Sequence, residues 1–183
     1  MTKSLLIDPK KVQQRSSLNL GSIKINDFSV PLTDSIVEIG KENSLKIYRN
    51  MFMIREFELM FDQLKKLGEY NGFKYKYLGP AHLSTGQEAA AVGQAMSLGI
   101  EDYILGSHRS HGEVLAKALT VIEDCDEFAI EEIFALDTYS HIALGFHSDT
   151  EDRKDRFIEL FLYGLVSEIL GKETGFNLSL IHI

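Results

Sequence analysis

Two histidines and an arginine, His108, Arg109 and His111, fall within four residues near the middle of the chain. They directly precede a segment with helical periodicity, and the N-terminus of a helix presents unpaired N–H groups and a partial positive charge. Phosphates bind at such ends, and a guanidinium matches two phosphate oxygens at once. Histidine moves protons near neutral pH. The pattern predicts a site for a phosphate-bearing ligand, with a turn whose charges only cap the helix as the competing interpretation.

A further histidine, His82, follows a Gly-Pro turn. A single histidine in this setting is more often a hydrogen-bonded structural residue, so we expect it to take part in chemistry only if the fold brings it near His108. A zinc site built from His108, His111 and either Glu113 or Cys125 is disfavoured, because the two histidines lack the i, i+4 spacing of the helical zinc motif.

Several common active-site motifs are absent from the sequence. It has no glycine-rich phosphate loop followed by Lys and Ser or Thr, no Gly-x-Gly-x-x-Gly and no Gly-x-Ser-x-Gly. Its one cysteine, Cys125, cannot form an internal disulfide, which favours a reducing compartment. No signal peptide and no apolar stretch long enough to span a membrane is visible, so we expect a cytoplasmic protein without a membrane partner.

The composition is that of a globular chain. It has 183 residues, of which 44% are apolar and 25% charged, and this predicts one domain with an ordinary core. The net charge of −8 disfavours nucleic acid as a partner. The acidity is uneven, because residues 123–159 contain 12 acidic and 3 basic residues, a local charge of −9.

A long helix is expected over residues 44–68, since apolar residues recur there at steps of three and four. Asn43 or Ser44 is placed to cap its start, and Gly68 to end it. Two of its faces are apolar. We therefore expect the helix to be buried on more than one side, inside an oligomer or a larger domain.

Turn and capping signals predict the elements next to the histidines. Capping boxes at Ser84-x-x-Gln87 or Thr85-x-x-Glu88 and at Ser110-x-x-Glu113 predict two helix starts. β-forming residues predict a strand between these helices. The expected elements are a loop over 69–83, a helix from near Ser84, a strand over 102–107 and a helix through 114–119.

Two more helices are expected toward the C-terminus. Residues 123–140 form an acidic amphipathic pattern, and residues 151–171 carry one continuous apolar stripe. The first helix is expected to turn its apolar side chains inward: Phe128, Ile130, Ile133 and Phe134.

Two stretches of the sequence are similar to a known family. Residues Gly79–Gly93 and Asp102–Gly112 resemble the α component of thiamin-diphosphate-dependent 2-oxo acid dehydrogenases. This E1 family includes the pyruvate, branched-chain 2-oxo acid and acetoin dehydrogenases. Residues Met53–Glu58 and Gly171–Gly175 also resemble it. The resemblance covers about 44–119 and 160–177.

The resemblance implies roles for four residues. Arg109 matches the arginine that binds the diphosphate of the cofactor, and His108 matches a neighbour that contacts cofactor and substrate. His82 matches a histidine at the substrate end of the thiazolium, with a catalytic and substrate-binding role. His111 matches a catalytic-loop histidine that acts in proton transfer or loop order.

The resemblance also implies a reaction and its partners. The reaction is oxidative decarboxylation of a 2-oxo acid, with transfer of the acyl group to a lipoyl group on an E2 acyltransferase. The family's site lies between subunits, so an E1 beta subunit or a fused beta part is expected. The family holds Mg²⁺ with a Gly-Asp-Gly sequence and a later Asn. This sequence contains no Gly-Asp pair, so we predict no metal ligand within it.

These observations predict an α/β fold class, namely the N-terminal and mostly helical part of a thiamin-diphosphate-binding fold with one or two strands. We expect the chain to be an E1 fragment that is inactive alone. The alternative is a non-catalytic binding or assembly module that uses the His108–Arg109 helix start for a phosphate or a partner. The expected divisions are an arm over 1–43, the start of the cofactor-binding domain over 44–119, an acidic helical insertion over 120–160, a return to the family pattern over 161–177, and a non-native end over 178–183.

Overall fold

The structure is a computed structural model, and it describes residues 8, 10, 14–15, 21–22, 29–76, 79, 82–134, 140–143 and 145–177. The chain divides into two units, residues 1–38 and residues 39–183. The first unit contains nearly all of helix α2 (Leu32–Ile39), which has no buried residue. The expected non-native end, 178–183, lies outside the described residues.

The long helix α3 (Lys41–Leu67) begins three residues earlier than the sequence predicted. Asn43 and Ser44 do not cap it. Their side chains lie within the first turn and donate to the carbonyl oxygens of Ile39 and Gly40, at 3.1 and 2.8 Å. The predicted end is confirmed. Gly68 adopts a left-handed conformation, and its N–H donates to Leu64 O at 2.9 Å.

The two apolar faces of α3 have different surroundings. One face is buried against α4 and α5 and includes Ile54, Phe57, Phe61 and Leu64. The other face is exposed in this chain, and it carries Leu45, Tyr48, Phe52 and Leu59. Burial on a second side is therefore not provided by the described part of the chain.

A small hairpin follows α3, within the stretch predicted as a loop. Strands β1 (Glu69–Tyr70) and β2 (Phe73–Lys74) pair antiparallel. The turn between them is Asn71-Gly72, and both residues have positive φ, which suits a tight two-residue hairpin. Next to it, the Tyr75 hydroxyl donates to Leu170 O at 2.9 Å, so at least one aromatic residue of this stretch fastens it to the core.

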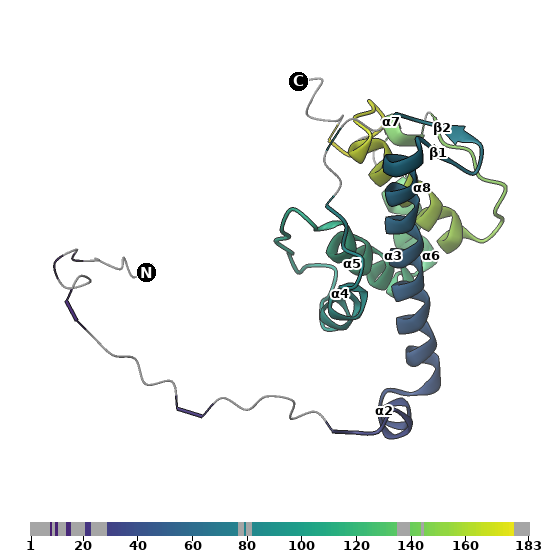
Figure 1. The fold of residues 1–183 in the computed structure, drawn as a ribbon. Helices are drawn as coiled ribbons and strands as arrows, with labels where there is room; N and C mark the ends of the chain where they lie inside the picture. Colours follow the sequence, from purple (N-terminus) through teal and green to yellow (C-terminus); the bar gives the residue numbers. More distant parts are fainter. Residues whose placement is uncertain are drawn as a thin grey trace. The chain divides into compact units, whose positions relative to one another are not determined.

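The remaining helices build outward from α3 through α5 and α8 (Figure 1). Helices α4 and α5 contact each other and α3, and α5 also contacts α8, which contacts α6 and α7. The described residues are mostly helical with two short strands, as the sequence predicted, but the strands lie in the stretch predicted as a loop. The bounds are α4 (Glu88–Ala95), α5 (His111–Asp124), α6 (Glu127–Phe134), α7 (Ser140–Ala143) and α8 (Arg153–Ile169).

The predicted strand over 102–107 is wrong. Residues 102–107 form neither helix nor strand, and Tyr103 and Leu105 are almost fully exposed, at 97% and 102%. A strand needs a neighbour to take its backbone hydrogen bonds. The only sheet among the described residues is the β1–β2 hairpin, which pairs with itself.

The predicted acidic helix over 123–140 is wrong at its start. Helix α5 continues to Asp124, the backbone is extended at Cys125, and α6 is described over Glu127–Phe134. Residues 135–139 lie outside the described residues. Ile130 is buried as expected, whereas Phe128 is 67% exposed. The side chains of Ile133 and Phe134 lie outside the described residues. Because α5 passes 119 without a break, the predicted boundary there falls inside a helix.

The last helix, α8, agrees with the predicted range to within two residues at each end. The Asp152 side chain caps its start by accepting from the N–H of Asp155 at 2.9 Å. Gly171 has a positive φ just after its end, which fits the expected stop.

Four helices, α3, α4, α5 and α8, form the core. Its larger cluster of buried side chains consists of Ile54, Phe57, Phe61, Ala91, Val92, Ala95, Leu115, Ala116 and Leu165, and a second cluster consists of Leu119, Ile122 and Ile158.

No helix in the described part of the chain is both long enough and apolar enough to span a bilayer.

Candidate functional site

The fold brings His82 next to His108. Their rings meet edge to face, with centroids 4.8 Å apart and an interplanar angle of 87°. The two residues are 26 positions apart in the sequence, and both side chains are exposed. A chemical role for His82 was expected only if the fold brings it near His108, and the two residues do lie together.

Arg109 fastens the turn before α5 to the loop that carries His82. Its Nη1 donates to Leu83 O at 2.9 Å, and its backbone N–H donates to Ser107 Oγ at 3.2 Å. The residue is exposed. A guanidinium has five N–H donors, so the contact with Leu83 O fixes its position and uses one of them.

Ser84 also joins the loop that carries His82 to the turn before α5. It is 1% exposed, its hydroxyl donates to Arg109 O, and its Oγ accepts from the N–H of Gly112 at 3.2 Å. Gly112 lies in the first turn of α5, so Ser84 caps this helix from outside. The close approach needs a glycine, because a Cβ on Gly112 would lie 3.0 Å from the Ser84 Cβ.

The predicted capping boxes are wrong for a related reason. Ser110 precedes α5 but makes no side-chain cap, and the Ser84 side chain serves that helix instead. Helix α4 begins at Glu88, four residues later than predicted, and Gln87 before it makes no side-chain cap. The Ser-x-x-Glu pattern records spacing along the chain only, whereas the cap here comes from a residue distant in sequence.

A buried carboxylate lies beneath these loops. Glu58 of α3 is fully buried, and its Oε2 accepts from the N–H of Ser84 at 3.1 Å. Its Oε1 lies 3.4 Å from Nδ1 of His111, whose side chain is 24% exposed. The His111 ring also lies against Phe57 and Phe61, with centroids 6.4 and 6.2 Å away. His111 is thus held against α3, whereas His82 and His108 are exposed.

Sequence reasoning missed Glu58, although a signal was present. The residue lies on the face of α3 that carries Ile54, Phe57 and Phe61. An acid among apolar helix positions is costly to bury without partners, so it marks a place where partners are provided.

An ion pair ties α3 to the start of α4. Arg55 Nε lies 2.5 Å from Glu88 Oε1, and the N–H of Gly86 donates to both Glu88 oxygens at 3.1 and 3.0 Å. The hydrogen bond from Arg55 lowers the pKa of Glu88 to about 2. The same bond raises the pKa of Arg55. The C-terminal end of the loop that carries His82 and Ser84 is therefore fixed to α3.

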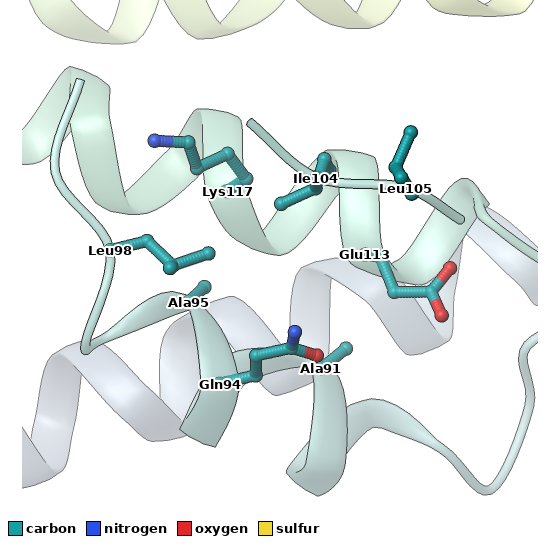
Figure 2. A pocket seen from close by; sticks show the side chains of 8 residues that line it. All are labelled: Ala91, Gln94, Ala95, Leu98, Ile104, Leu105, Glu113 and Lys117. Atoms are coloured by element: carbon teal, nitrogen blue, oxygen red, sulfur yellow. The ribbon is translucent and has the colours of Figure 1, made fainter. Parts of the chain in front are cut away.

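The hollow in Figure 2 is too small for an organic cofactor. It lies between α4 and α5, and residues 98–105 close it on a further side. Its volume is about 30 Å³, whereas pockets that bind organic ligands have roughly 300 Å³ or more. The charged ends of Glu113 and Lys117 point in opposite directions along α5. This hollow is a small gap in the packing between the two helices.

A larger hollow of about 280 Å³ adjoins the start of α5, and His82, His108 and Arg109 do not line it either. These three residues are exposed, so the described part of the chain does not enclose a ligand over them. The larger hollow is lined by Ser84, Gln87, Ala90, Ala91, Gln94, Gly112 and Glu113.

The donor set fits a diphosphate group better than a metal ion. Arg109 and two imidazoles gather where α5 presents its N-terminus, and all of these groups favour an anion. Among the described residues, no three His, Cys, Asp or Glu side chains are grouped so that they could hold a metal.

The region that contains these residues matches known proteins. Residues 53–138 match the family described as Dehydrogenase E1 component. The pyruvate dehydrogenase E1 component subunit alpha of Rhizobium meliloti is 40% identical over 82 residues, which are 45% of this chain and 22% of that protein. The testis-specific mitochondrial form of Rattus norvegicus is 41% identical over 83 residues, 45% of this chain and 19% of that protein. The somatic mitochondrial form of Homo sapiens is 36% identical over 85 residues, 46% of this chain and 20% of that protein.

The matches support the resemblance found in the sequence. Part of this chain is therefore similar to the E1 component of a dehydrogenase. The relatives named here are alpha subunits of pyruvate dehydrogenase. The chain spans about a fifth of the length of these curated relatives. No solved structure matches the chain. All four predicted site residues lie within the matched range 53–138.

Proposed function

We propose that this chain forms the alpha-subunit side of a thiamin diphosphate site, in an E1 component that carries out oxidative decarboxylation of a 2-oxo acid. The observation that carries the proposal is the contact of His82 with His108 beside Arg109, at the N-terminus of α5 and inside the matched range. The described relatives are named for pyruvate dehydrogenase, so pyruvate is the first substrate to test.

We assign each residue the role that the resemblance implies and that its surroundings allow. Arg109, held by Leu83 O, and the N–H groups of α5 bind the diphosphate. His82 and His108 face outward together and orient the substrate through their ring nitrogens. His111, held against α3, acts in proton transfer. When bound, thiamin diphosphate supplies the electron sink for decarboxylation.

The open position of the site agrees with partners that complete it. His82, His108 and Arg109 are exposed, and a reaction of this kind needs a site that excludes water. We propose that an E1 beta subunit, or a fused beta part, covers this face and that a lipoyl-bearing E2 acyltransferase accepts the acyl group. Residues outside this chain would supply the Mg²⁺ ligands. The cytoplasmic location stays a prediction.

The test is a cofactor-binding experiment on the complete alpha subunit encoded by the parent gene, assembled with its beta partner. Arg109→Ala removes a charge-assisted hydrogen bond to the diphosphate, and we expect the Kd for thiamin diphosphate in the presence of Mg²⁺ to rise about 10-fold or more. Titration calorimetry measures the Kd directly.

The matched control is Arg153→Ala, which removes an arginine that pairs with Glu127 and Glu131 on the acidic side of the chain. We expect the Kd to stay unchanged in this variant. Equal Kd values for Arg109→Ala and the unaltered protein would remove Arg109 from the site. Absence of cofactor binding by the unaltered assembly would favour the alternative of a non-catalytic binding module.

A further inference from the structure

The buried pair formed by Glu58 and His111 has a chemical consequence beyond packing. Glu58 is fully buried on α3, and a buried carboxylate is costly unless its oxygens are paired. Its Oε2 accepts from the N–H of Ser84. Its Oε1 and the Nδ1 of His111 are both buried, and neither has a hydrogen-bond partner among the described residues. The two atoms face each other at 3.4 Å.

For an ionised Glu58 and a neutral His111, one arrangement of protons satisfies both atoms. A carboxylate oxygen has no proton to donate, so the proton between the two atoms is then on Nδ1. The separation is slightly longer than an ordinary N–H···O bond, and hydrogen bonds of this type are often long before a ligand binds. We propose that Glu58 is a positioning residue that holds neutral His111 in the tautomer with a proton on Nδ1 and none on Nε2.

This tautomer decides what His111 can do. With Nδ1 bonded to a carboxylate, the lone pair is on Nε2, which then accepts a proton. A carboxylate that orients an imidazole in this way is a known means of preparing a general base. The catalytic meaning of the tautomer rests on the proposed function, because His111 is the residue proposed there for proton transfer.

Glu58 also binds the loop that carries Ser84. Its second oxygen holds the N–H of Ser84, and the Ser84 hydroxyl in turn contacts Arg109 O and the N–H of Gly112. Because the Ser84 N–H needs an acceptor, a glutamine at position 58 would keep its carbonyl oxygen there. Its amide NH₂ would then face Nδ1 of His111 as a donor.

The test therefore uses Glu58→Gln, a substitution that keeps the shape of the side chain. We expect the unaltered chain to show Nδ1 of His111 protonated and Nε2 unprotonated. We expect Glu58→Gln to reverse this, because the amide can only donate to an Nδ1 that has no proton. Long-range ¹⁵N–¹H correlation spectra of the ¹⁵N-histidine-labelled chain, at a pH where histidine is neutral, distinguish the two forms. The chain has six histidines, and a His111→Gln spectrum identifies the signal.

The matched control is Glu113→Gln, which removes another carboxylate in the first turn of α5. Its Oε2 is likewise buried without a hydrogen-bond partner among the described residues, so the substitution makes the same change in charge next to His111. We expect the His111 tautomer to stay as in the unaltered chain. If Glu58 had only a structural role, Glu58→Gln would leave the His111 tautomer unchanged.

Two results would overturn the inference. One is a proton on Nε2 of His111 in the unaltered chain, which decides the matter even if Glu58→Gln does not fold. The other is an unchanged tautomer in a folded Glu58→Gln chain. Neither result depends on a cofactor. Failure of the thiamin diphosphate titration would leave the tautomer assignment in place, and failure of the tautomer assignment would leave the titration in place.

Discussion

The turn before α5 and the acidic segment 123–159 are both rich in polar side chains, but they use them in opposite ways. Around the turn, Glu58 and Ser84 are buried and bond to groups from distant parts of the chain. In the acidic segment, Arg153 pairs with Glu127 and Glu131 while more than half of each side chain stays exposed. The first arrangement fixes loops that carry candidate site residues. The second joins helix surfaces that water also solvates.

The two regions also differ in the direction in which the pKa of a carboxylate is shifted. In the first region, the hydrogen bond from Arg55 lowers the pKa of Glu88 to about 2. At the edge of the second region, burial raises the pKa of Glu123, although Arg49 lies 3.7 Å from it. A charge that is paired at close range stabilises the fold, and a charge that is buried with a distant partner costs stability.

The largest expected effect comes from making the same substitution in both carboxylates. Glu88 titrates lower in the folded chain than its usual 4.5, so its contribution to stability is complete above pH 4.5 and is lost as the pH falls toward 2. Glu88→Gln should lower the free energy of unfolding at pH 7 by roughly 1–2 kcal/mol. It should also reduce the loss of stability between pH 4.5 and 2. Urea unfolding at several pH values measures both effects.

Glu123→Gln is the matched counterpart and should act with the opposite sign. The raised pKa of Glu123 means that its charged form costs stability above its folded pKa, and this cost disappears as the pH falls below 4.5. At pH 7 the variant should therefore be as stable as the unaltered chain or more so. If both variants lose stability equally at pH 7, the distinction between the two regions fails.

A smaller effect is expected from Ser84→Ala. The change removes the acceptor of the Gly112 N–H and the donor to Arg109 O, both at the start of α5. Loss of a helix cap costs about 1 kcal/mol, and we expect a loss of this size in urea unfolding. Ser107→Ala is the control, since Ser107 is exposed and accepts one bond from the Arg109 N–H. Equal losses in the two variants would show that burial of the hydroxyl does not matter.

Local signals located the two long helices α3 and α8. The apolar periodicity located α3 and α8, and the glycines at their ends, Gly68 and Gly171, have the left-handed backbone that such stops require. A helix satisfies its backbone within one segment, so the segment itself carries the information. The turn that carries His108 and Arg109 was also placed correctly before a helix.

Features that depend on distant partners were not predictable in this way. The stretch 102–107 has β-forming residues but no neighbouring strand among the described residues, so it does not become a strand. The cap of α5 comes from Ser84, which lies 28 residues before the N–H that it accepts from. The contact of His82 with His108 likewise became visible only in the fold. Sequence spacing states which residues are near along the chain, and these three features depend on nearness in space.

The smallest effect is expected from Arg153→Ala, and it tests the comparison from the other side. Arg153 contacts Glu127 and Glu131, so it bridges α8 and α6 and has the appearance of a structural link. All three side chains are more than half exposed, and exposed ion pairs are screened by water and salt. We expect the free energy of unfolding to change by less than about 0.5 kcal/mol, with the difference vanishing at high salt. Urea unfolding at low and high salt measures it. A loss above about 1.5 kcal/mol that persists at high salt would mean that this pair acts as the buried carboxylates do, and exposure would no longer separate the two regions.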